Sequence, residues 1–168
     1  STALFQLHLE ELGIQSCLLS ALDFMRIDKD LEPDSFYIKH NLERELKQCE
    51  SKLYITQGYI CRNVFGEIDN LKRGGSDYSA SLIGAANQAT EIEIWTDIDG
   101  MHNNDPRVVD NTFSIEQLSY NEAAELAYFG AKILHPASVY PAQLSEIPIW
   151  LKNTMEPTKL GTKIAKTV

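Results

Sequence analysis

Short apolar segments alternate with longer amphipathic segments along this chain, and this alternation limits the fold more than any other feature of the sequence. Segments with the length and pattern of strands lie at residues 14–20, 53–60, 91–96 and 149–151. Segments with helical spacing or a helix start signal lie at residues 2–12, 38–49, 79–89, 119–130 and from Pro136 onward. Strands that alternate with helices predict an α/β fold, with helices on both faces of a sheet and ligands at the carboxyl ends of its strands.

Individual residues sharpen this prediction. Ser119 is followed three residues later by Glu122, the pattern of a capping box at a helix start. Pro136 suits the first position of another helix, because proline lacks the N–H that this position leaves unpaired. Trp95 and Trp150 lie within or at the end of predicted strands, and we expect both in the core.

The charge balance excludes several classes of function. The chain has 15 Lys and Arg residues against 24 Asp and Glu residues, a formal net charge of −9. This acidic excess repels phosphate backbones, so we expect no nucleic-acid partner, and any polyanionic ligand needs a local cluster of donors. No apolar stretch approaches the roughly 20 residues that span a bilayer, and the first ten residues lack a signal-peptide pattern. We expect no membrane partner and no secretion.

The three cysteines are odd in number, widely spaced and without a CxxC pair. Cys17, Cys49 and Cys61 therefore predict reduced thiols in a cytoplasmic protein.

The first candidate site is Arg-Gly-Gly-Ser-Asp at residues 73–77. Adjacent glycines let the backbone approach a ligand, the following helix start presents free N–H groups, and the Arg73 guanidinium can bind a carboxylate with two hydrogen bonds. These features predict an anion site. A tight turn with Ser76 or Asp77 as a helix cap explains the same residues equally well.

The second candidate site is the end of the strand at residues 91–96. Thr96 and Asp97 lead into Asp99 and Gly100, and Asp105-Pro106-Arg107 follows. Hydroxyl and carboxylate groups with an arginine could hold a nucleotide. The aspartates could instead bind a divalent metal, although the EF-hand spacing is absent. An acidic, solvated turn is the third interpretation.

The third candidate site is the Lys132 region, just after a predicted helix end and among apolar residues. A partly buried lysine needs an anionic partner such as a phosphate, whereas a surface lysine with a packed stem needs none. We interpret His135 as structural. The GxSxG, HExxH and Walker A motifs are absent from the sequence.

Together, the stretches at residues 72–80, 94–109 and 122–136 resemble the aspartate kinases of the amino acid kinase family. The resemblance runs from residue 1 to about residue 161 and implies the family's three-layer α/β/α sandwich, incomplete in this chain. It also implies transfer of a phosphoryl group from MgATP to L-aspartate, giving 4-phospho-L-aspartate for lysine, threonine and methionine synthesis. Residues 162–168 would begin a linker toward regulatory ACT domains.

The resemblance implies a role for each matching residue. Arg73 and Ser76 would hold a substrate carboxylate, and Asp77 would orient the substrate near its amino group. The nucleotide would be bound by Thr96, Asp97, His102, Arg107, Lys132 and the backbone of Ile133. Asp77 and Lys132 would be the catalytic residues, and relatives often have Tyr where this chain has His102.

The resemblance places two stretches of these kinases ahead of residue 1: a Lys-Phe-Gly-Gly-Thr segment that holds the transferred phosphate, which does not occur in the sequence, and a later Gly-Glu that meets the amino group of the substrate. We therefore expect a fragment, the carboxyl-terminal portion of the catalytic domain, that is inactive alone. The resemblance also implies a homo-oligomeric parent whose feedback amino acid binds ACT domains outside the chain. The alternatives are a non-catalytic interaction or regulatory fragment and another amino acid kinase, specific for glutamate, acetylglutamate or uridylate.

Overall fold

The computed structural model describes residues 1–72, 74–104, 108–129 and 134–166. The chain separates into two compact units, Ser1–Gly75 and Ser76–Val168, and each is described by itself. Among the described residues, none of the helices has both the length and the apolar character needed to span a bilayer.

Unit 1 contains three helices and two small sheets. In chain order its elements are α1 (Thr2–Glu11), β1 (Cys17–Leu18), α2 (Ala21–Phe24), α3 (Ser35–Gln48), β2 (Tyr54–Ile55), β3 (Ile60–Arg62) and β4 (Ile68–Asn70). Strand β1 pairs with β2 in parallel, and β3 pairs with β4 in an antiparallel hairpin. The predicted strand at residues 53–60 is thus divided between β2 and the start of β3.

Local chemistry explains where the helices of unit 1 begin and end. Gly13 has a φ of 74° directly after α1, a conformation that glycine adopts without steric penalty. Asp34 caps α3, because its Oδ1 accepts a hydrogen bond of 3.0 Å from the Tyr37 N–H. The Arg26 guanidinium pairs with Asp34 and lies 3.8 Å from the centre of the Tyr37 ring.

The prediction of three reduced thiols is wrong for two of the cysteines. Cys17 in β1 and Cys49 at the end of α3 form a disulfide, whereas Cys61 is free and buried. The sequence carries no pairing signal, because the two cysteines are separated by 32 positions and meet only when α3 returns beside β1. Burial raises the pKa of the Cys61 thiol to about 11.

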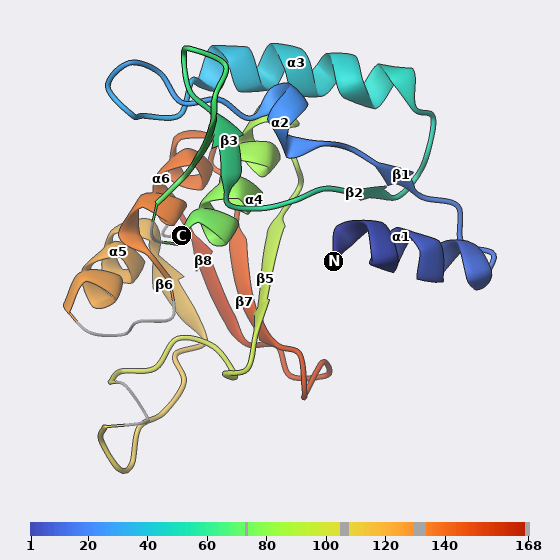
Figure 1. Cartoon of the computed structure of the whole chain (residues 1–168). Helices are drawn as coiled ribbons and strands as arrows, with labels where there is room; N and C mark the ends of the chain where they lie inside the picture. Colours follow the sequence, from blue (N-terminus) through green and yellow to red (C-terminus); the bar gives the residue numbers. More distant parts are fainter. Residues whose placement is uncertain (73, 105–107, 130–133, 167–168) are drawn as a thin grey trace. The chain divides into compact units, whose positions relative to one another are not determined.

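Unit 2 contains a four-stranded mixed sheet and three helices (Figure 1). In chain order its elements are α4 (Gly75–Ala86, which begins at the unit boundary), β5 (Ile92–Thr96), β6 (Gln117–Ser119), α5 (Tyr120–Phe129), α6 (Pro136–Leu144), β7 (Ile149–Asn153) and β8 (Thr162–Ala165). The strand order is β5-β7-β8-β6, with β7 and β8 antiparallel and the outer pairs parallel. The α/β class is confirmed.

One face of this sheet carries the core of unit 2. Alternate strand residues point into it: Leu118, Ile92, Ile94, Ile149, Leu151 and Ile164. Helices α5 and α6 contribute Ala123, Val139 and Ala142, and the Ser81 hydroxyl on α4 donates a hydrogen bond to the Ser138 carbonyl on α6. The described helices α4, α5 and α6 therefore pack on this face, with Ala80 of α4 against the core.

The opposite face of the sheet is charged and aromatic, and it corrects the expectation that both tryptophans are in the core. Trp95 is 43% exposed and donates a hydrogen bond of 3.0 Å to Glu93. Trp150 is half-buried, with the ammonium groups of Lys152 and Lys163 5.8 and 5.5 Å from its ring centre. The alternation of side chains along a strand places these residues away from the core.

Predicted helix starts in unit 2 are confirmed, whereas two strands were not predicted. Glu122 accepts hydrogen bonds from the Ser119 N–H and hydroxyl, and Pro136 occupies the first turn of α6. Strands β6 and β8 are short and give a weak pattern. Residues 162–165, which we expected to begin a linker, form β8 inside the sheet; a domain boundary near residue 161 stays a prediction.

The disulfide makes a direct prediction about thiol chemistry. In denaturant without reductant, one thiol (Cys61) should react with Ellman's reagent, and three should react after reduction. Reduction should lower the free energy of unfolding by about 3–4 kcal/mol, because the bond closes a loop of 32 residues. The doubly substituted Cys17→Ser/Cys49→Ser chain is the control, with a melting temperature that reductant does not change. Three reactive thiols before reduction would contradict the disulfide.

Candidate functional site

The candidate nucleotide segment begins at the carboxyl end of β5. The Thr96 hydroxyl donates a hydrogen bond of 3.0 Å to Asp97 Oδ1, and the chain then turns through Gly100, whose φ is 116°. From there it leaves the sheet, and the two described ends of residues 101–115, a segment named here the 101–115 loop, pair antiparallel at His102 and Ser114. The N–H of Ile115 donates to the carbonyl of Met101 at 2.7 Å, and the N–H of Asn103 to the carbonyl of Phe113 at 3.2 Å.

His102 braces the base of this loop. Its side chain is 8% exposed, with Nε2 2.7 Å from Asp99 Oδ1 and Nδ1 3.1 Å from Thr112 Oγ1. The hydrogen bond with His102, assisted by Lys159 at 3.7 Å, holds the pKa of Asp99 below its usual value. Because both ring nitrogens already have partners, His102 could bind a nucleotide only through the ring edge or after these hydrogen bonds break.

The metal interpretation of the aspartate loop has no support in the described part of the chain. Asp97 and Asp99 are described, and Asp105 lies outside the described residues. Among the described residues, no group of three His, Cys, Asp or Glu side chains is placed to hold a metal ion. Asp99 is already engaged by His102 and Lys159.

The candidate anion site at residues 73–77 is a helix start, as its glycines predicted. Gly74 has a φ of 73°, and a Cβ on Gly75 would lie 2.7 Å from Cδ2 of Tyr59. Glycine is therefore required for the close approach of this backbone to Tyr59. Ser76 and Asp77 follow in the first turn of α4, where backbone N–H groups have no partner within the helix.

Asp77 differs from an ordinary surface carboxylate. It is half-buried, and burial raises its pKa above the usual value because the charged form loses hydration. A carboxylate kept partly dehydrated at a helix start is typical of a functional residue, since burial without function lowers stability.

The remaining predicted site residues cannot be placed. Arg73, Arg107, Lys132 and Ile133 lie outside the described residues. The structure thus describes Thr96 and Asp97 at the end of β5, His102 at the base of the loop, and Ser76 and Asp77 at the start of α4. The proposed cationic residues of the site remain predictions.

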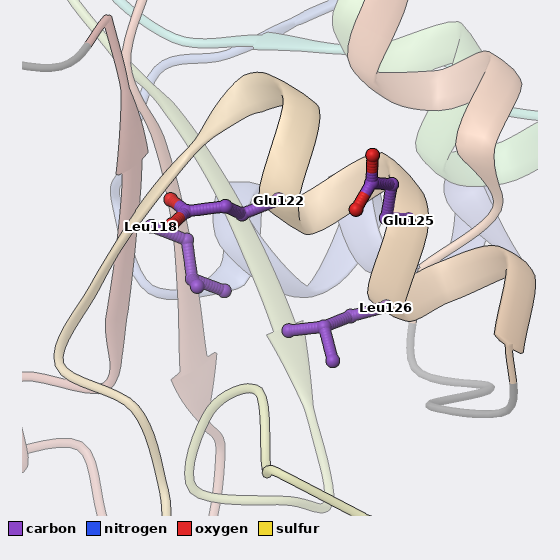
Figure 2. Close-up of a pocket in the computed structure, with 4 residues that line it drawn as sticks. All are labelled: Leu118, Glu122, Glu125 and Leu126. Carbon is purple, nitrogen blue, oxygen red and sulfur yellow. The ribbon is translucent and has the colours of Figure 1, made fainter.

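A cavity of about 280 Å³ beside α5 was not predicted from the sequence (Figure 2). Leu118 and Leu126 form apolar walls, and Glu122 and Glu125 provide its carboxylates. Hydrogen bonds from Ser119 lower the pKa of Glu122 and keep it ionised. With two glutamates in its lining, this cavity disfavours phosphate. In the sequence, Glu122 was noted only as part of a capping box. That role accounts for a helix start and does not indicate a cavity.

A larger groove, of about 520 Å³, opens near Trp150. Its charged residues are Asp99, Glu116, Lys159 and Lys163, so both signs of charge line it. Lys159 already pairs with Glu156 at 2.8 Å. The groove therefore favours no single class of ligand.

Comparisons with known proteins identify relatives of this chain. The model of the amino acid kinase family matches residues 1–153. Lysine-sensitive aspartokinase 3 of Escherichia coli K12 is 38% identical over 168 residues, covering 98% of this chain and 37% of that protein. An aspartokinase of Chlamydia pneumoniae is 46% identical over 109 residues, covering 65% of this chain and 25% of that protein.

Solved structures agree with these matches. E. coli aspartokinase III, in a complex with aspartate and ADP, has a TM-score of 0.91 and 36% identity over 99% of this chain. The match covers 38% of that structure, so the chain spans little more than a third of the E. coli enzyme. The UMP kinase of Bacillus anthracis, with a TM-score of 0.63 and 14% identity over 99% of this chain and 65% of that one, shares the fold alone.

The raised pKa of Asp77 predicts a stability gain on neutralisation. Because folding raises the pKa of Asp77, ionisation of this residue at pH 7 opposes folding. The resulting loss of stability disappears as the pH falls below the pKa of Asp77 in the unfolded state, about 3.9. Asp77→Asn should therefore increase stability at pH 7 by roughly 0.5–2 kcal/mol, with a gain that shrinks toward pH 4. Thermal melts between pH 4 and 8 measure this, with the exposed Asp110→Asn as control. A lower melting temperature for Asp77→Asn at pH 7 would refute it.

Proposed function

This chain belongs to the amino acid kinase family, and within that family we propose that it is part of the catalytic domain of an aspartate kinase. The reaction is transfer of the γ-phosphoryl group of ATP to the side-chain carboxylate of L-aspartate, giving ADP and 4-phospho-L-aspartate. One observation carries the proposal: nearly the whole chain superimposes on an aspartokinase in a complex with aspartate and ADP, at 36% identity.

The charge of the chain determines what the site has to supply. L-aspartate and ATP are both anions, and a chain with a net charge of −9 repels them. Binding therefore depends on local donors at the matching motif positions. In this proposal Arg73 and Ser76 hold a substrate carboxylate, and Asp77 orients the substrate near its ammonium group. The exposed Ser76 and the half-buried Asp77 in one helical turn support this division.

The nucleotide is assigned to the end of β5 and the segments around it. Thr96 and Asp97 offer a hydroxyl and a carboxylate to the nucleotide, while Arg107, Lys132 and the backbone of Ile133 flank its phosphates. The cavity walled by Leu118 and Leu126 suits the base, because its carboxylates exclude phosphate and can accept a hydrogen bond from an exocyclic amino group. His102 supports the loop in this proposal.

Phosphoryl transfer needs positioning and neutralisation of charge more than covalent catalysis by the protein. An aspartate carboxylate oxygen forms a bond to the γ-phosphorus as the bond to the β–γ bridging oxygen breaks, and ADP leaves. Lys132 and Arg107 would neutralise charge on the transferred group and on the departing diphosphate. Mg²⁺ would enter with ATP and neutralise part of its phosphate charge.

The chain alone is expected to be inactive. It spans 37% of the length of the E. coli relative, and the Lys-Phe-Gly-Gly-Thr stretch expected around the transferred phosphate does not occur in its sequence. We place the complete activity in a cytoplasmic homo-oligomer that acts in lysine, threonine and methionine synthesis. Its feedback amino acid binds ACT domains outside these residues, as expected for an allosteric kinase.

Substrate choice separates this proposal from the other kinases of the family. A hydroxamate assay on the full-length protein that contains this chain should give MgATP-dependent acyl phosphate with L-aspartate, and at least about 100-fold less with L-glutamate. The reason is that the extra methylene of glutamate moves the side-chain carboxylate out of position for attack on the γ-phosphorus when the other groups of the substrate are held. N-acetylglutamate and UMP are further controls. Equal rates with glutamate, or a rate with UMP alone, would disprove the assignment to aspartate.

Nucleotide binding tests the assignment of Lys132 on this chain directly. Calorimetric titration of MgATP should show saturable binding, and Lys132→Ala should weaken it at least about tenfold, because one charge-assisted hydrogen bond to phosphate is lost. Lys166→Ala is the matched control, since Lys166 is exposed and pairs with Glu146. Circular dichroism verifies folding of each variant. A folded chain whose affinity is unchanged by Lys132→Ala would remove this residue from the site.

A further inference from the structure

Thr162, the first residue of β8, ties together both ends of the 101–115 loop. Its side chain is buried, with 0% exposure. Its hydroxyl oxygen accepts a hydrogen bond of 2.7 Å from the Met101 N–H and donates one of 2.6 Å to the Ile115 carbonyl. A single hydroxyl thus pairs with both the N–H of the buried Met101 and the carbonyl of the partly buried Ile115.

The surrounding backbone is built to bring this hydroxyl to the loop. A Cβ on Gly100 would lie 2.5 Å from the Thr162 Oγ1, and Gly100 has a φ of 116°. A Cβ on Gly161, whose φ is 72°, would overlap the carbonyl oxygen of Leu151. Both glycines are therefore needed for Thr162 to sit at the base of the loop, and a larger residue at either position would displace it.

Further contacts join the described parts of the loop to one another and to its base. One backbone hydrogen bond joins Ile115 to Met101, and a longer one joins Asn103 to Phe113. His102 adds its ring contacts to Asp99 and Thr112. The loop follows the end of β5, which carries Thr96 and Asp97, two residues assigned to the nucleotide. The hydroxyl of Thr162 is thus the buried side-chain contact that holds both loop ends at the sheet.

We propose that Thr162 is a positioning residue for the nucleotide, acting through the backbone of Met101 and Ile115. The inference rests on the proposed function, because the nucleotide role of the loop does. Thr162 itself touches no substrate in this scheme. Without its hydroxyl, the Met101 N–H and the Ile115 carbonyl lose their shared partner, and the base of the loop loosens while the backbone hydrogen bond between them remains.

Two substitutions separate positioning from general destabilisation. Thr162→Val keeps the shape and β-branching but removes both hydrogen bonds, and Thr162→Ser keeps the hydroxyl but removes a methyl group. In the full-length protein that contains this chain, Thr162→Val should raise the KM for MgATP about tenfold. The KM for L-aspartate should stay within about twofold of wild type, and Thr162→Ser should restore the KM for MgATP to within about threefold. A merely structural role predicts that Ser, which leaves a cavity, behaves no better than Val.

Hydrogen exchange without nucleotide tests the clamp independently of catalysis. Thr162→Val should speed exchange of the Met101, Asn103 and Ile115 amides about tenfold, while the amides of β7 keep their protection. Unchanged exchange in the loop, equal rises in both KM values or failure of Thr162→Ser to rescue would each overturn the proposal. A wild-type protein without kinase activity would overturn the proposed function instead, and the exchange experiment would still decide whether Thr162 holds the loop.

Discussion

The parallel pairing of β5 with β7 is the constraint on which the rest of unit 2 depends. Its register runs from Ile92 opposite Ile149 to Thr96 opposite Asn153. This register directs the isoleucines to the helices and Glu93 and Lys152 to the other face. A slip of one residue in either strand would turn the charged side chain of that strand, Glu93 or Lys152, into the core. The same register brings the carboxyl ends of both strands to one edge, where Thr96 accepts a backbone hydrogen bond of 2.8 Å from Thr154.

Elements with local signals were predictable from the sequence, and elements that depend on distant partners were not. Three of the signals depend only on residues nearby in the sequence: the capping box at Ser119, the proline at residue 136 and the alternating pattern before Thr96. Strand β8 has few apolar residues and becomes a strand because β7 and β6 flank it. The Cys17–Cys49 disulfide likewise requires a tertiary approach. Trp95 shows that residue type alone does not predict burial, because its apolar ring lies on the charged face of the sheet.

The residues of the candidate site likewise divide into those with a local sequence signal and those that depend on distant partners. Adjacent glycines correctly predicted the start of α4, since their conformational freedom is a property of residues 74 and 75 themselves. The resemblance singled out His102 but not its partners, because Thr112 is ten positions away and meets the ring only in the folded chain. The cavity walled by Leu118 and Leu126 combines a strand with a helix and had no separate signal. The placement of Arg73, Arg107 and Lys132 stays a prediction.

The tight fit around Thr162 has a consequence for how this protein can vary. Gly100 faces the Thr162 hydroxyl, and Gly161 faces the Leu151 carbonyl, so the fitness effect of a change at one position depends on its neighbours. Alanine at residue 100 would stay strained even beside a smaller residue 162, because its φ of 116° disfavours a side chain and because backbone atoms of Thr162 and Gly161 lie within 3.3 Å of the added Cβ. Variation at residues 100 and 161 is therefore limited by backbone conformation as well as by the neighbouring atoms.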